Sequence, residues 1–170
     1  GAKGMEKMGV STQLLAGGDI YPALELGTID ATEFSMPAID LKLGFHQVAK
    51  HYYFPGWHQQ STLFDLMVNK AKWDALSKTQ QAQIEAVCGD NIRHGFAEGE
   101  AIQFGALKEL KEKGVNIHVW PQEILDTLQK AWVEVAAEQA AADADFKRAW
   151  ESLQNFRKDY ATWKEVGYLR

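Results

Sequence analysis

Residues 10–35, which read VSTQLLAGGDIYPALELGTIDATEFS, determine the fold expected for the start of the chain. The short, partly apolar run 10–15 ends at a Gly-Gly pair, which is typical of a strand followed by a turn. Asp19 is suited to cap a short helix after that turn. The run 29–35 is again strand-like. A strand–helix–strand order favours a partly parallel sheet, and the open edge of such a sheet is the natural place for a ligand cleft.

Short elements continue over residues 36–69. Apolar side chains over 38–48 recur at helical spacing. The stretch KHYYFPGW at 50–57 is aromatic and extended. The apolar run TLFDLMV at 62–68 predicts a buried strand. The character of the sequence changes after Asn69, where long helical patterns begin.

Helical periodicity dominates residues 70–170. The expected elements are a short helix over 70–76, a long helical region over 79–113, a strand over 115–120 and a second long helical region over 122–165. The apolar residues of the first long region share one face, and Cys88 on that face is predicted to be a buried thiol. The second region is too long for one ordinary helix, so a kink or a helix pair is expected. We therefore expect a cleft-forming α/β segment over 1–69 and a long-helix segment over 70–170 that completes the same lobe.

The composition is that of an ordinary globular domain, with 46% hydrophobic and 24% charged residues among 170. A net charge of −5 argues against a nucleic-acid-binding surface. No run approaches the roughly 20 apolar residues of a membrane span. The single cysteine excludes an internal disulfide and a cysteine-rich zinc site, and leaves the compartment open. The chain begins Gly-Ala-Lys-Gly, without Met or a leader, which indicates processing or a start inside a longer gene.

Catalytic and nucleotide-binding motifs are missing from the sequence. The five histidines form no zinc-binding spacing, and neither a nucleophile elbow nor a phosphate loop is present. The Gly-Gly-Asp run at 17–19 fits an anion cradle or simply a capped turn. Glu33, at the end of a strand-like run, could bind a cation or a ligand hydroxyl, or could be a solvated residue of an edge strand.

Three linked blocks resemble the solute receptors of tripartite ATP-independent periplasmic (TRAP) transporters, the DctP-like family. They are GGDIYPAL at 17–24, GTIDATEF at 27–34, and a block between 43 and 58 that begins LG and ends YYFPGWH. The segment VNKAKWDALSKTQQAQIEAV at 68–87 also fits the family pattern, and the likeness weakens beyond about residue 110. The members most similar to this chain are those that bind 2-oxo acids, lactate or similar monocarboxylates.

The resemblance implies a ligand site without catalysis. In such receptors the glutamate of the Ala-Thr-Glu-Phe block, here Glu33, ligates a cation that the substrate also touches. The next residue, here Phe34, contributes its main-chain carbonyl and walls the pocket. Trp57, His58 and Gln59 would form another part of the substrate site. A hard cation such as Na⁺ or Ca²⁺ fits oxygen ligands and lets an anion sit beside an acidic side chain. Relatives often carry Glu where this chain has Gln59, which leaves the substrate class open.

The resemblance also implies what surrounds this site. The fold would be an α/β, type II periplasmic-binding-protein-like domain with a short mixed sheet and long C-terminal helices, and part of the N-terminal domain would be missing. The family's substrate-binding Arg and a further cation ligand would lie upstream of Gly1. The receptor would be periplasmic, would capture a small organic carboxylate, and would deliver it to TRAP permease subunits in the membrane.

Two other interpretations stay open. An aromatic stripe near the C-terminus packs under its own domain or docks on a partner, for example as a homodimer. Its members are Phe146, Trp150, Leu153, Phe156, Tyr160 and Trp163. The least favoured alternative is a small hydrolase that uses Glu33 and His58 as acid and base.

Overall fold

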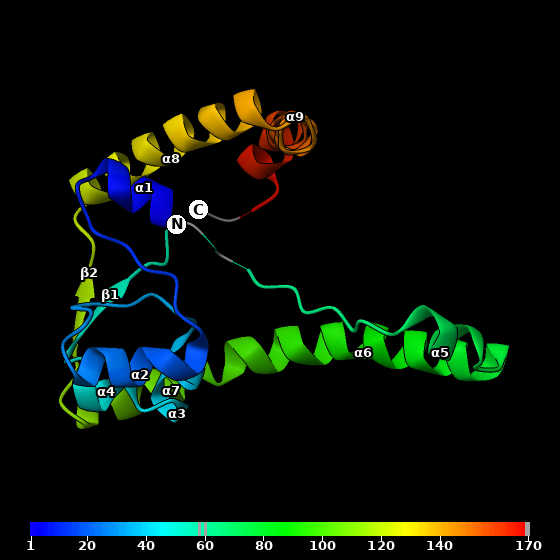
Figure 1. The fold of residues 1–170 in the computed structure, drawn as a ribbon, viewed down its shortest axis with the longest axis horizontal. Helices are drawn as coiled ribbons and strands as arrows, with labels where there is room; N and C mark the ends of the chain where they lie inside the picture. Colours follow the sequence, from blue (N-terminus) through cyan, green and yellow to red (C-terminus); the bar gives the residue numbers. More distant parts are fainter. Residues whose placement is uncertain (58, 60, 169–170) are drawn as a thin grey trace. The chain divides into compact units, whose positions relative to one another are not determined.

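The computed structural model describes residues 1–57, 59 and 61–168 (Figure 1). The chain forms two compact units: one combines 1–14 with 120–170, and the other spans 15–119. The boundary predicted after Asn69 lies inside the second unit, and the division into 1–69 and 70–170 stays a prediction.

The unit 15–119 contains a small parallel sheet. Strand β1 (His51–Phe54) pairs with β2 (Asn116–Val119) in parallel register, with Tyr52 opposite Ile117. The strand predicted over 115–120 is thus confirmed, and the stretch 50–57, predicted to be extended, contains β1. Parallel neighbours need a long crossover, and here the chain between them forms three helices.

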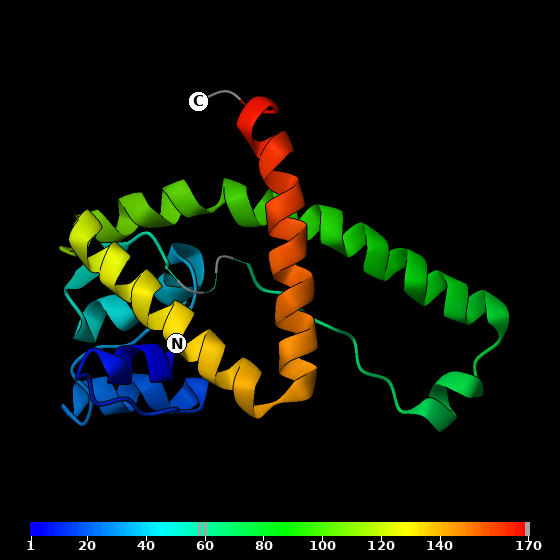
Figure 2. The same ribbon diagram turned by 90° about the horizontal axis from the view of Figure 1, so that it is seen from above.

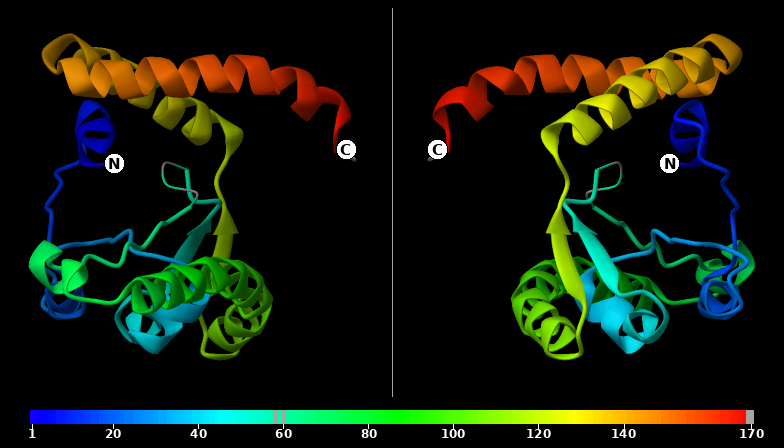
Figure 3. Two further views of the ribbon diagram at one scale, coloured as in Figure 1. Left: turned by 90° about the vertical axis from the view of Figure 1, so that its right-hand side faces the viewer. Right: turned by 90° about the vertical axis from the view of Figure 1, so that its left-hand side faces the viewer.

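The two strands of this sheet lie side by side in Figure 3. Four helices of the same unit pack on one another. They are α2 (Gly17–Glu25), α3 (Pro37–Lys42), α4 (Phe45–Val48) and α7 (Gln103–Glu112). Helix α3 lies on α7, and the backbone amide of Ala38 donates to Gln103 Oε1 at 3.1 Å. The buried apolar residues of this unit are Ile20, Ala38, Phe45, Ala106, Leu110 and Val115.

Three predicted strands are wrong. Residues 10–15, 29–35 and 62–68 form no strand in the structure. A strand needs a neighbour for its backbone hydrogen bonds, and no described segment pairs with any of the three. The run 62–68, which we expected to be buried, is extended and exposed instead.

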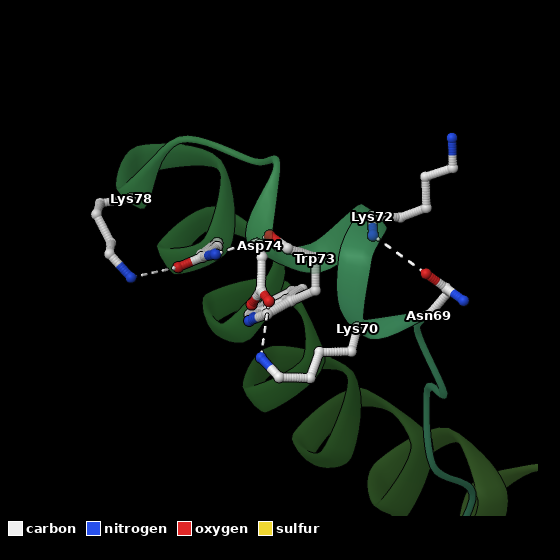
Figure 4. Close-up of polar contacts among 7 residues, drawn as sticks. Asn69, Lys70, Lys72, Trp73, Asp74 and Lys78 are labelled. Atoms are coloured by element: carbon white, nitrogen blue, oxygen red, sulfur yellow. Dashed lines mark hydrogen bonds and ion pairs between the residues drawn. The ribbon is translucent and has the colours of Figure 1, made fainter.

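The short helix predicted over 70–76 is confirmed as one helix, and the long helical region predicted over 79–113 is divided into two. Helix α5 (Lys70–Asp74) begins at Asn69, whose Oδ1 accepts from the Lys72 amide at 3.2 Å (Figure 4). Helix α6 (Lys78–Ala101) begins at a capping box formed by Ser77 and Gln80. Helix α7 follows α6 directly, with only Ile102 between them. Cys88 on α6 is exposed, so the prediction of a buried thiol is wrong, because no described element covers that face.

The unit of 1–14 and 120–170 consists of α1 (Ala2–Lys7), α8 (Gln122–Ala142) and α9 (Ala144–Val166). Helix α1 packs on α8, whose buried residues are Leu128, Ala131, Val135 and Ala136. The predicted break in the last helical region is confirmed at Asp143, which is extended and caps α9 through the Phe146 amide (Figure 2). None of the helices in the described part of the chain is both long enough and apolar enough to cross a membrane.

Candidate functional site

Glu33 and Phe34 lie on the loop that joins α2 to α3, and not on a strand. The Phe34 ring meets the Phe45 ring edge-on, with centroids 5.7 Å apart. A Cβ atom at Gly17 would lie 3.2 Å from Phe34 Cε2, so glycine at the start of α2 lets the ring approach closely. The loop is therefore anchored at Phe34, immediately beside Glu33.

A buried carboxylate that we did not predict from the sequence stands next to this loop. Asp40 on α3 is only 9% exposed, and its Oδ2 accepts a hydrogen bond from the Tyr52 hydroxyl of β1. Burial raises the pKa of Asp40, the Tyr52 hydroxyl opposes that shift, and repulsion from the Glu33 carboxylate adds to it. The sequence feature that could have indicated this buried carboxylate is an aspartate among apolar residues in a short helix that begins at Pro37.

Trp57 and Gln59 lie on the loop that follows β1. Trp57 is half-buried, while Gln59 is exposed and donates from Nε2 to Thr62 Oγ1 at 3.0 Å. His58, which we also predicted for the site, lies outside the described residues.

Asp40 connects the elements that carry the two loops. Its helix directly follows the Glu33 loop, and the Glu33 charge raises its pKa. Its hydrogen bond reaches β1, from which the Trp57 loop departs. The structure thus brings Glu33, Phe34, Asp40 and Tyr52 into one neighbourhood. That Trp57, His58 and Gln59 face Glu33 in the same pocket stays a prediction.

The donor chemistry fits a hard cation in part. A carboxylate and main-chain carbonyls, the groups available at Glu33 and Phe34, are the oxygen ligands that Na⁺ and Ca²⁺ prefer. Within the described residues, no cluster of three or more His, Cys, Asp or Glu side chains could hold a metal ion alone. Glu33 and the Phe34 carbonyl would therefore be an incomplete ligand set, to be completed by groups from elsewhere.

Comparison with known proteins defines the class. Residues 2–143 match the family model DctP, the bacterial extracellular solute-binding proteins of family 7, and the chain belongs to that family. The predicted resemblance is thereby confirmed, as is the expectation of a solute-binding protein and not an enzyme. The family is extracytoplasmic, in agreement with the predicted periplasmic location.

A similar protein is the monocarboxylate 2-oxoacid-binding periplasmic protein of Nostoc sp., 34% identical over 99% of this chain and 46% of its own length. Among solved structures, a TRAP transporter solute-binding protein from Bordetella bronchiseptica has a TM-score of 0.86 at 38% identity, over 96% of this chain and 48% of its own. That structure is a mixed-occupancy dimer with copurified calcium and picolinate.

A second solved relative comes from Colwellia psychrerythraea, a TRAP periplasmic solute-binding protein with bound calcium and pyruvate. Its TM-score is 0.85 at 27% identity, over 97% of this chain and 51% of its own. A third, from Pseudoalteromonas atlantica, holds sodium and pyruvate, with a TM-score of 0.82 at 26% identity over 96% of this chain and 50% of its own. The chain thus spans about half the length of the relatives it matches, and the fold class predicted from the resemblance is confirmed.

Proposed function

We propose that this chain forms part of the solute receptor of a TRAP transporter, which captures a 2-oxo acid or a related monocarboxylate together with Na⁺ or Ca²⁺. The observation that carries this proposal is the anchored loop of Glu33 and Phe34 in a chain whose relatives hold such ligands with such cations. Glu33 would ligate the cation, and the Phe34 ring and carbonyl would wall the pocket.

The site needs a cation because of its charge. Glu33 and Asp40 are acidic neighbours, and they would repel an anionic ligand. A bound cation would offset that repulsion and attract the ligand carboxylate directly. The loop with Trp57, His58 and Gln59 would form a further wall, and the bound receptor would deliver its ligand to the permease subunits of the transporter.

Calorimetry with pyruvate tests the proposal, in the receptor assembled with the half that this chain does not span. We expect binding that needs Na⁺ or Ca²⁺ and that weakens at least about tenfold in Glu33→Gln, a loss of about 1.4 kcal/mol. Glu25→Gln, at the exposed end of α2, is the matched control and should leave the affinity for pyruvate unchanged. Cation-independent binding, or equal affinity in Glu33→Gln and Glu25→Gln, would contradict the proposal.

The isolated chain should bind weakly, because Glu33 and a carbonyl are only part of a ligand set. Titration of the isolated chain with pyruvate, lactate and other 2-oxo acids measures this directly. Tight binding would show that the described residues form a complete site.

A homodimer through α9 is a second candidate, and one observation favours it. Several aromatic and apolar residues of α9 are partly exposed: Leu153, Phe156, Tyr160 and Trp163. Light scattering of the chain and of Trp163→Ala would test this. A dimer that the substitution dissociates supports the candidate, and a monomer in both contradicts it.

A further inference from the structure

The run 62–68 is an apolar segment that no other described residues cover. Its large apolar residues are exposed, Phe64 by 90% and Met67 by 92%, and Leu63, Leu66 and Val68 are exposed as well. Because side chains of an extended chain alternate between two faces, both faces of this segment are apolar. An extended run of this kind is typical of a strand buried on both sides in a parallel sheet.

The backbone of this run is also unpaired. Among the described residues, none from 62 to 68 takes part in a backbone–backbone hydrogen bond. Its C-terminal end is nevertheless held, since Asn69 caps α5 and Trp73 of α5 accepts from Gln81 of α6 at 2.8 Å (Figure 4). The segment thus presents the edge groups of a strand on both sides.

Helix α6 carries a matching apolar face. Cys88, Ile92 and Phe96 recur at every fourth residue and so share one side of the helix. Cys88 is exposed, and Ile92 and Phe96 are each more than two-thirds exposed. The chain runs outward through 62–68 to α5, and α6 runs back in the opposite direction (Figures 1 and 2). A strand followed by an antiparallel helix is the first part of a βαβ unit, in which the helix covers one face of a parallel sheet.

We propose that residues 62–68 form an interior strand of a second sheet, whose remaining strands come from the part of the receptor that this chain does not span. The apolar face of α6 covers that sheet on one side. The length of the relatives supports this occupant, because their solved chains match nearly all of this chain and still contain an equal length outside the match. A second copy of this chain fits less well, because pairing 62–68 with its own copy would fill one edge of each strand and leave the other edge open.

Hydrogen–deuterium exchange tests this without any ligand, so its outcome is independent of the proposed solute. In the isolated chain, amides of 62–68 should exchange at the rate of unprotected peptide at every protein concentration. In the assembled receptor they should exchange at least about 100-fold more slowly, as expected for an interior strand. Unprotected amides in the assembled receptor would overturn the proposal. Protection that appears in the isolated chain and rises with its concentration would also overturn it, and would identify a second copy as the occupant.

A pair of substitutions at Leu66 separates strand pairing from packing. Leu66→Pro removes the backbone N–H that a ladder would use, whereas Leu66→Ile keeps it together with the side-chain volume. We expect both variants to melt like the wild type in the isolated chain. In the assembled receptor only Leu66→Pro should melt lower, by several degrees. Equal melting of the two variants in the assembled receptor would contradict an interior strand.

Discussion

Helices α6 and α7 are separated only by Ile102, yet they expose their apolar residues to very different degrees. Leu110 of α7, the helix on which α3 packs, is 2% exposed, whereas Phe96 of α6 is 77% exposed. Both helices carry apolar side chains at the same helical spacing. The difference shows that amphipathic spacing predicts an apolar face on a helix. Whether that face is buried depends on which other segments of the chain pack on it.

The largest expected effect comes from truncating one apolar side chain to alanine on each of the two helices. Leu110→Ala would leave a cavity in the core of this unit, and we expect a loss of about 3 kcal/mol in the free energy of unfolding. Ile92→Ala on α6 removes an exposed side chain, and we expect a change within about 0.5 kcal/mol. Urea denaturation of the isolated chain measures both. A cost at Ile92 comparable to that at Leu110 would mean that α6 is covered in solution.

The second effect tests the polar contact that holds α3 to β1. Tyr52→Phe removes the hydroxyl that donates to Asp40 and leaves a buried carboxylate without that donor. We expect a loss of about 1–3 kcal/mol in the free energy of unfolding. Tyr21→Phe is the control, because its hydroxyl makes only an exposed 3.4 Å contact with Gln47. Equal costs for the two variants would show that the Asp40 contact adds nothing.

Asp40 should also make stability depend on pH. Burial raises its pKa in the folded chain above the ordinary 3.8, so the folded state favours the protonated carboxyl. The contribution of Asp40 to the free energy of unfolding is therefore greatest below about pH 3.8 and declines as the pH rises through its raised pKa in the folded chain. As the pH rises from about 3.8 through the raised pKa of Asp40, we expect the free energy of unfolding of Asp40→Asn to increase relative to that of the wild type. The difference should then stay constant at higher pH. A difference between wild type and variant that stays constant with pH would contradict this assignment.

The same contrast explains how much could be predicted from sequence. The long helical regions and the break near Asp143 were largely predictable, because helical periodicity and its interruption are local signals. The strands over 10–15, 29–35 and 62–68 were not, because a strand exists only with a neighbour and no described residues supply one. For the site, the resemblance pointed to Glu33 and Phe34, whereas the role of Asp40 became visible only when its burial and the Tyr52 contact were known.

The smallest expected effect concerns what holds α6 in shape while its apolar face is uncovered. Ser77 Oγ accepts from the Gln80 amide at 3.2 Å, and Gln80 Oε1 accepts from the Ser77 amide at 2.9 Å. Ser77→Ala removes the first of these bonds, and we expect a loss of about 1 kcal/mol together with reduced helical circular dichroism. Thr79→Ala, in the same turn, is the matched control and should change little.

This last effect should depend on context more than the others. A helix with little tertiary burial relies on its local bonds, so loss of the cap should fray α6 in the isolated chain. If the remaining half of the receptor covers α6, packing would hold the same residues, and Ser77→Ala should lose less helix there. An equal loss of helical signal in the isolated chain and in the assembled receptor would indicate that α6 stays uncovered in both.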